Sequence, residues 1–126
     1  MSSEDKIYIS WSDLEKLVEV LCEKISQEKY SSIYGIPRGG LIPAVLVSHK
    51  LGIPVVDKIY DNTIVIDDIC DSGLTLNNKH KYTATLHYRK TSVYKPTYYA
   101  SELDNDNWIV YPWEMYDSLP IQDYKL

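Results

Sequence analysis

Three acidic and two hydroxyl side chains lie close together between residues 67 and 75, directly after an apolar run. Asp67 and Asp68 follow the run TIVI (63–66), and the segment DSGLT (71–75) begins after two further residues. A β-branched apolar run is typical of a central strand in a parallel sheet. Ligands of open α/β sheets bind beyond the carboxyl ends of strands, where free N–H groups at helix starts attract anions. The pattern therefore predicts a phosphate in the 71–75 loop and sugar hydroxyls on the two acids.

A second candidate anion loop follows an upstream strand. Residues 31–36 (SSIYGI) have the character of a short buried strand, and PRGG (37–40) comes directly after them. Adjacent glycines allow a close backbone approach, and the planar guanidinium of Arg38 suits a phosphate or pyrophosphate. Alone, this loop is equally well read as a tight turn with a surface arginine. Beside the acidic loop, it favours a second anion site of the same design.

Helices are expected to support both loops. Ser12 and Glu15 form a capping-box pattern, and apolar residues then recur at helical spacing, which predicts a helix from about residue 13 to 26. Residues 41–51 predict a second helix, with a proline tolerated in its first turn. A short helix is expected from residue 75 to about 80.

Strand patterns complete the scaffold. Residues 55–60 and 63–66 are separated only by Asp61 and Asn62, which tolerate positive φ, so a tight antiparallel hairpin is predicted. The residues from Tyr116 are expected to form a tail. Two further strands are predicted at residues 6–10 and 82–88.

Composition limits the class of protein and of partner. The 126 residues predict one domain, residues 1–126, and 44% hydrophobic with 25% charged residues is an ordinary balance. A net charge of −5 argues against a nucleic-acid partner, which favours a basic surface. We expect no membrane partner and a cytoplasmic location, because no apolar run approaches about 18 residues and no signal-peptide pattern is present.

Cysteine and histidine do not suggest a metal or nucleophilic site. Cys22 falls on the apolar side of the first predicted helix and Cys70 in the acidic loop, so no disulfide is expected. The histidines lack zinc-ligand spacing and are interpreted as solvent-exposed or hydrogen-bonded core residues. They are His49, His80 and His87.

These segments resemble a known family. IVIDDICDSGLT (64–75) resembles the phosphoribosyl-pyrophosphate (PRPP) motif of type I phosphoribosyltransferases. IYGIPRGGLIPAVLVSHKLGIP (33–54) is similar to the pyrophosphate loop and following helix of bacterial xanthine-guanine phosphoribosyltransferases, and WIVYPWE (108–114) to their purine-binding segment. ISWSDLEKLVEVLCEKI (9–25) is similar to their opening, so nearly the whole chain is covered. The resemblance implies an α/β fold with a central, mostly parallel sheet, flanking helices and a small C-terminal base-binding hood.

The resemblance also implies roles for the acidic residues. Asp67 and Asp68 would hold the ribose hydroxyls and contact the Mg²⁺ that accompanies pyrophosphate, for which oxygen ligands are suited. Asp71 would act as general base or acid near the purine N7. Catalysis would therefore involve these three acids together with Arg38.

The phosphates and the base have further implied contacts. Trp108 would stack on the base and the backbone of Ile109 would read its edge, while either Arg89 or Lys90 would read the 6-oxo group. In the family, the peptide before the arginine of the pyrophosphate loop can be non-trans. The phosphate-binding residues implied are Arg38, Gly39, Gly40, Asp67, Asp68, Asp71, Ser72, Gly73, Leu74 and Thr75.

The implied activity is purine salvage: transfer of the 5-phosphoribosyl group from PRPP to guanine, xanthine or hypoxanthine, with release of pyrophosphate, in a homodimer or homotetramer. One departure is evident, because the long mobile loop that normally precedes the PRPP motif is replaced by Asp61 and Asn62. This departure keeps open a catalytically weak or inactive regulatory protein that binds PRPP or a nucleotide. The sequence is also compatible with a structural protein without ligand, with a pyrimidine or small-amine acceptor, and with a core or subunit-contact role for Trp108 and Trp113.

Overall fold

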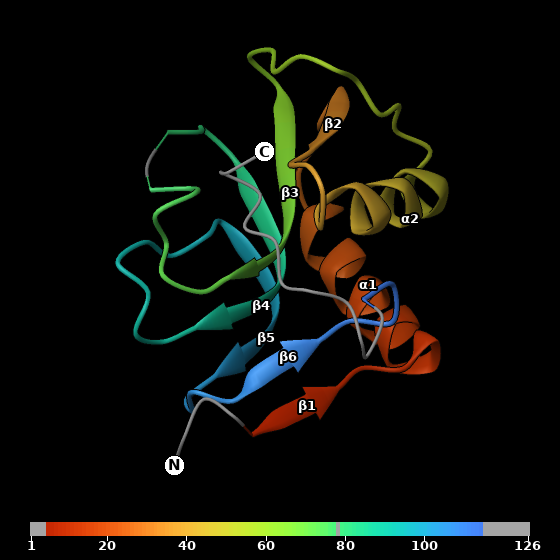
Figure 1. Cartoon of the computed structure of the whole chain (residues 1–126). Coiled ribbons are helices and arrows are strands. Elements are labelled where there is room, and N and C mark those ends of the chain that lie inside the picture. The colour runs from red at the N-terminus through yellow and green to blue at the C-terminus, as the bar shows by residue number, and fades with distance from the viewer. Residues whose placement is uncertain (1–4, 78, 115–126) are drawn as a thin grey trace.

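A four-stranded parallel sheet with two helices forms the body of the molecule (Figure 1). The computed structural model describes residues 5–77 and 79–114, so the tail expected from Tyr116 lies outside the described residues. The elements in chain order are β1 (Lys6–Tyr8), α1 (Trp11–Ile25), β2 (Ser32–Gly35), α2 (Leu41–Leu51), β3 (Thr63–Cys70), β4 (Thr83–Arg89), β5 (Tyr98–Leu103) and β6 (Trp108–Val110).

The main sheet has the order β2-β3-β4-β5, and every neighbouring pair is parallel. A separate parallel pair, β1 and β6, joins segments from near the two ends of the chain, with Lys6 opposite Trp108. The predicted central parallel sheet flanked by helices is confirmed. Because all four strands run the same way, their carboxyl ends meet at one edge of the sheet.

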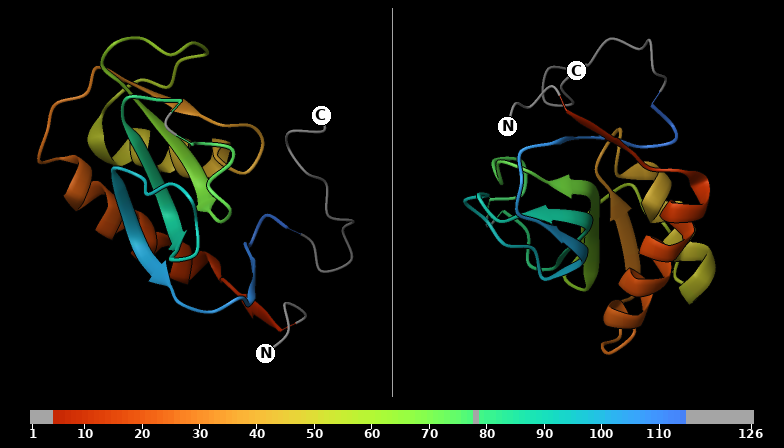
Figure 2. Two further views of the ribbon diagram at one scale, coloured as in Figure 1. Left: turned by 90° about the vertical axis from the view of Figure 1, so that its left-hand side faces the viewer. Right: turned by 90° about the horizontal axis from the view of Figure 1, so that it is seen from below.

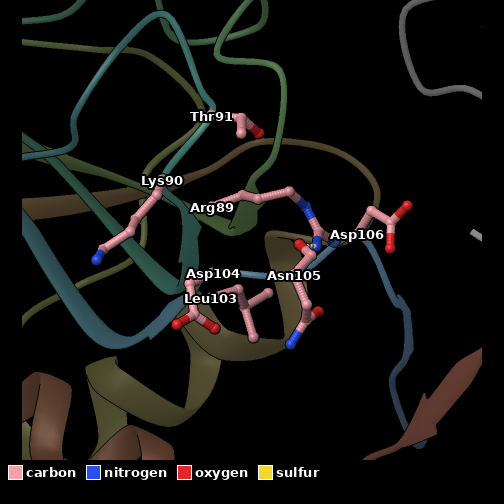
Figure 3. A pocket seen from close by; sticks show the side chains of 7 residues that line it. All are labelled: Arg89, Lys90, Thr91, Leu103, Asp104, Asn105 and Asp106. Carbon is pink, nitrogen blue, oxygen red and sulfur yellow. Dashed lines mark hydrogen bonds between the residues drawn. The ribbon is translucent and has the colours of Figure 1, made fainter. Parts of the chain in front are cut away.

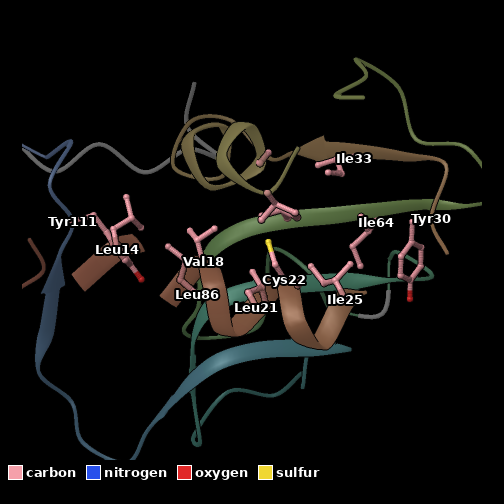
Figure 4. Packing of buried hydrophobic residues seen from close by; sticks show 14 of the residues in the cluster. Leu14, Val18, Leu21, Cys22, Ile25, Tyr30, Ile33, Ile64, Leu86 and Tyr111 are labelled. Carbon is pink, nitrogen blue, oxygen red and sulfur yellow. The ribbon is translucent and has the colours of Figure 1, made fainter. Parts of the chain in front are cut away.

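Both helices cover the same face of the sheet (Figure 2). Helix α2 packs on β2 and β3, α1 packs on β4 and β5, and the two helices contact each other. The apolar side of α1 is buried in the core (Figure 4), where each large aliphatic side chain contributes about 1.5–3 kcal/mol. The buried residues of α1 are Leu14, Val18, Leu21, Cys22 and Ile25.

Helix α1 begins two residues earlier than expected. The sequence SWSDLE contains two overlapping capping-box patterns, and the structure uses the first of them. The backbone N–H of Asp13 donates to Ser10 Oγ at 3.0 Å, and that of Ser10 donates to Asp13 Oδ2 at 3.0 Å. The predicted cap at Ser12 is therefore wrong, whereas α2 has the predicted bounds.

The predicted hairpin before β3 is also wrong. Val55 forms only an isolated parallel bridge with Ile33, whose N–H donates to the carbonyl oxygen of Pro54 at 2.9 Å. Strand β2 thus lies between residues 54–56 and β3, and the two expected hairpin partners cannot pair.

The expected 75–80 helix is not observed, and its described residues form turns instead. The N–H of Asn77 donates to the carbonyl oxygen of Gly73, and that of Lys79 donates to the carbonyl oxygen of Leu76. No helix in the described residues is long and apolar enough to cross a membrane.

Candidate functional site

The acid pair lies inside strand β3 rather than after it, because β3 continues to Cys70. The N–H of Asp68 donates to Asp67 Oδ1 at 2.9 Å, and that of Ile69 donates to Asp68 Oδ1 at 2.7 Å. Asp67 is buried and Asp68 is half-buried. The two carboxylates are thus held by the backbone of their own strand, near its carboxyl end.

The loop that contains Arg38 packs directly against this acid pair. A Cβ added at Gly39 would lie 2.1 Å from Asp68 Oδ2, and one added at Gly40 would lie 2.4 Å from the carbonyl oxygen of Ile66. The Pro37–Arg38 peptide is cis, and Arg38 is exposed. The structure therefore brings the arginine-diglycine loop against the acid pair, and a side chain at either glycine would force a neighbouring group to shift.

The 71–75 loop is supported from behind by residues 92–94. Gly73 has a φ of 87°, and a Cβ there would lie 2.4 Å from Ser92 Oγ. The N–H of Val93 donates to the carbonyl oxygen of Ser72 at 2.9 Å. This support leaves four residues of the loop exposed, namely Asp71, Ser72, Leu74 and Thr75.

Asp71, at the start of the loop, forms an ion pair that the sequence did not reveal. Arg89 Nε donates to Asp71 Oδ1 at 2.6 Å, and Nη2 donates to the carbonyl oxygen of Asn107 at 2.9 Å. Nη1 donates to the carbonyl oxygen of Asn105. Arg89 is 7% exposed at the end of β4. One guanidinium therefore joins the end of β3 to the turn that leads into Trp108.

Lys90, the other candidate for reading the base, points away from this contact. Its Nζ lies 3.6 Å from Glu102 Oε2, and both side chains are exposed. Figure 3 shows Arg89 reaching toward Asn105 and Asp106 while Lys90 turns to the opposite side. These residues line a hollow of about 510 Å³, formed by Arg89, Lys90, Thr91, Leu103, Asp104, Asn105 and Asp106.

The two tryptophans of the 108–114 segment differ in their surroundings. Trp108 is 41% exposed on β6, whereas its neighbour Ile109 is 7% exposed. Trp113 stacks on Tyr111, with ring centroids 4.8 Å apart and an interplanar angle of 2°. The core interpretation is therefore wrong for Trp108, while Trp113 packs against the core.

Tyr111 and His87 were not predicted to belong to the site. Tyr111 Oη lies 2.7 Å from His87 Nδ1 and donates to the carbonyl oxygen of Asp68 at 3.2 Å. Burial lowers the pKa of His87 to about 4, with the charge of Arg89 adding to the effect, and burial raises the pKa of Tyr111 well above its usual value. His87 is thus a hydrogen-bonded core histidine, one of the two roles expected for the histidines, but its partner is 24 residues away.

The residues present would suit Mg²⁺ only with help from a ligand. No group of three or more metal-ligating side chains occurs within residues 5–77 and 79–114. Asp67 and Asp68 supply hard oxygen atoms, and Mg²⁺ commonly takes one or two carboxylates together with substrate phosphates and waters. The acid pair therefore fits an ion that arrives with a pyrophosphate.

No protein-family model matches the chain, but comparison with individual proteins finds similar sequences. A xanthine-guanine phosphoribosyltransferase of Idiomarina loihiensis is 26% identical over 90% of each chain. That of Chromohalobacter salexigens is 29% identical over 85% of this chain and 83% of its own.

Solved structures show the same fold. A purine phosphoribosyltransferase from Pyrococcus horikoshii superposes with a TM-score of 0.79 at 29% identity, over 93% of this chain and 99% of that one. The xanthine-guanine-hypoxanthine phosphoribosyltransferase of Helicobacter pylori gives a TM-score of 0.71 at 20% identity, over 86% and 94%. In sequence and in fold, this chain is similar to purine and xanthine-guanine phosphoribosyltransferases.

Proposed function

We propose that the protein transfers the 5-phosphoribosyl group from PRPP to a 6-oxopurine, namely guanine, xanthine or hypoxanthine, and releases pyrophosphate. The observation that carries the proposal is the contact between Asp68 Oδ2 and Gly39, where a Cβ would lie only 2.1 Å from the carboxylate. It brings the acid pair, which would bind the ribose, against the arginine-diglycine loop. A molecule with a ribose and a pyrophosphate on neighbouring atoms fits that combination.

PRPP would lie across the carboxyl end of β3. Asp67 and Asp68 would hold the 2′ and 3′ hydroxyls, and the pyrophosphate would lie on Arg38 and the backbone at Gly39 and Gly40. Mg²⁺, when bound with PRPP, would neutralise charge on the departing pyrophosphate. The 5′-phosphate would be wrapped by the 72–75 loop, with the exposed hydroxyls of Ser72 and Thr75 and the backbone at Gly73 and Leu74.

The base would lie beside Arg89, on the side where Asp71 and the turn before Trp108 meet. A guanidinium only donates hydrogen bonds, so it complements the oxygen of a 6-oxopurine and opposes the amino group of adenine. Its other contacts, to Asp71 and to the Asn107 carbonyl, support Arg89 over Lys90 for this role. Trp108 offers an exposed face for stacking on the base, next to the backbone of Ile109.

In the proposed reaction the C1′–O bond of PRPP breaks, and a purine nitrogen attacks the cation-like ribosyl centre. Asp71 takes or returns the proton at the purine, while Arg38 holds the pyrophosphate in place. The protein contributes mainly position and fixed charge. No covalent intermediate is required.

The test is to incubate the purified protein with PRPP, Mg²⁺ and each purine separately, and to measure nucleotide and pyrophosphate. We expect guanine, xanthine or hypoxanthine, but not adenine, to yield equal amounts of both products. Asp71→Asn should lower kcat strongly and leave nucleotide affinity nearly unchanged. Absence of product with every base would reject the enzymatic proposal.

One observation favours a second candidate, a regulatory protein that binds PRPP or a nucleotide with little turnover. The 52–62 connection lies near the amino end of β3, since the carbonyl oxygen of Asn62 accepts from the N–H of Ser31 just before β2. The hydrogen bonds that this connection forms with β2 and with Thr63 lie at the end of β3 opposite the acid pair, so it would supply no lid against water. Tight nucleotide binding without product would support this candidate. In the enzymatic proposal, a neighbouring subunit of a homodimer or homotetramer would cover the site.

A further inference from the structure

The buried pair formed by His87 and Tyr111 contacts the candidate ribose site from behind. Both residues are nearly inaccessible, at 4% and 2% exposure. The pair joins β4 to the 108–114 segment and ends on the carbonyl oxygen of Asp68. Neither side chain is among the residues that would touch PRPP or the base.

Counting hydrogens fixes the direction of the bonds. A phenol has one hydrogen, and the carbonyl oxygen of Asp68 can only accept. Tyr111 Oη therefore donates to Asp68 at 3.2 Å and accepts from His87 Nδ1 at 2.7 Å. This requires His87 to carry its proton on Nδ1, and the lowered pKa of the ring keeps it neutral at pH 7.

The acceptor belongs to the peptide group that also orients the Asp68 carboxylate. That peptide joins the carbonyl of Asp68 to the N–H of Ile69, and this N–H donates to Asp68 Oδ1 at 2.7 Å. Tyr111 Oη therefore binds the carbonyl oxygen of this peptide group, while the N–H of the same group binds the Asp68 carboxylate. Bonds in such a chain also polarise one another, which strengthens the N–H donor.

Tyr111 is fixed in place independently of its hydroxyl. Its ring stacks on Trp113, and its N–H donates to Glu114 Oε1 at 2.8 Å. Removing the hydroxyl alone should leave the 108–114 segment in position. The effect of the bond on Asp68 can thus be separated from any effect on base binding.

We propose that His87 and Tyr111 are positioning residues that, through the 68–69 peptide, aim the Asp68 carboxylate at the ribose of PRPP. The inference rests on the proposed function, because it assigns a purpose to the geometry of the proposed ribose site. It predicts an effect on PRPP and none on the base.

The central test is Tyr111→Phe, assayed for phosphoribosyl transfer. We expect the KM for PRPP to rise about five- to tenfold, which corresponds to one hydrogen bond, while the KM for the base stays within about twofold. Tyr30→Phe is the matched control, because it removes a similar phenol bond, 2.6 Å to Tyr98 Oη, outside the site. The control should leave both KM values unchanged. An unchanged KM for PRPP in Tyr111→Phe, or an equal rise in both KM values, would overturn the proposal.

A second pair of variants tests His87. Asparagine places an N–H near the position of Nδ1, whereas the longer glutamine places its amide near Nε2. His87→Asn should therefore keep a KM for PRPP close to wild type, and His87→Gln should behave like Tyr111→Phe. Equal behaviour of the two variants would contradict the assignment of this bond to Nδ1 of His87.

Two readouts do not depend on turnover. Nitrogen-15 NMR of the histidine side chains should show His87 protonated on Nδ1 in the wild type and changed in Tyr111→Phe; an Nε2–H tautomer in the wild type would refute the inference. Calorimetry should show about five- to tenfold weaker binding of PRPP with Mg²⁺ by Tyr111→Phe. If the wild type forms no nucleotide, the proposed function fails, and these two measurements still decide the positioning role.

Discussion

Gly39→Ala tests whether the contact between the arginine-diglycine loop and the acid pair determines activity. The added Cβ would lie 2.1 Å from Asp68 Oδ2, whereas ordinary contact begins at 3.4 Å. The carboxylate or the loop must therefore shift by about 1.3 Å, the difference between these distances. A displacement of about 1 Å at a reacting centre can lower a rate by about 100-fold. We expect kcat/KM for PRPP to fall by about 100-fold, or about 2.7 kcal/mol of transition-state stabilisation.

The assay is PRPP-dependent nucleotide formation, with the free energy of unfolding measured in urea alongside. Gly52→Ala is the matched control, since Gly52 has a φ of 68° and nothing within 4 Å of an added Cβ. It should lower stability by about 1 kcal/mol through backbone strain and leave the KM for PRPP unchanged. A Gly39→Ala protein that folds and keeps its kcat/KM within threefold of wild type would refute the reasoning.

Three further predictions address the base, the core and a helix cap. Arg89→Lys should raise the KM for the purine by about tenfold or more in steady-state assays, because a lysine cannot keep the forked contacts, whereas Lys90→Ala should change it less than about twofold. His87 binds its proton more weakly in the folded state, with a pKa of about 4 against 6.5, so stability should fall as the pH drops from 6.5 to 4 by up to about 3 kcal/mol. Urea unfolding of wild type and His87→Asn across that range should show the smaller fall in the variant, and equal falls would exclude the effect. Ser10→Ala should cost about 1 kcal/mol in the same assay and Ser12→Ala almost nothing, and a reversed order would contradict the observed cap.

The parts of the fold that depend on local pattern were predicted well. Helix α2 has the expected bounds of residues 41 and 51, and β4 differs from its expected range by one residue at each end. Local sequence signals suffice for such elements; α2, for example, lies between Gly40 and Gly52 at its two caps. The α1 cap was misplaced because two overlapping capping boxes compete within SWSDLE, and periodicity alone does not choose between them.

The errors arise where pairing depends on distant segments. Asp61 and Asn62 carry a genuine local turn signal, but β2 occupies the place beside β3 that a hairpin partner would need. Similarly, the Asp71–Arg89 ion pair depends on the register of β3 against β4, which the sequence does not reveal for two residues that are 18 positions apart. The roles assigned to the two loops remain predictions, although the structure brings the arginine-diglycine loop against the acid pair.

The strand-like segment 54–56 also has a consequence for how the protein behaves at high concentration. An uncovered outer strand presents free backbone groups that can pair with another molecule and start aggregation. Residues 54–56 cover the outer edge of β2. The N–H of Val56 donates to the carbonyl oxygen of Ile33, and the carbonyl oxygen of Pro54 accepts from the N–H of Ile33. On β5, the other outer strand, Lys24 of α1 donates to the carbonyl oxygen of Tyr99 and places a charge there. Residues 54–56, part of the segment predicted to form a hairpin, thus cover the edge of the sheet at β2, and Lys24 protects the edge at β5.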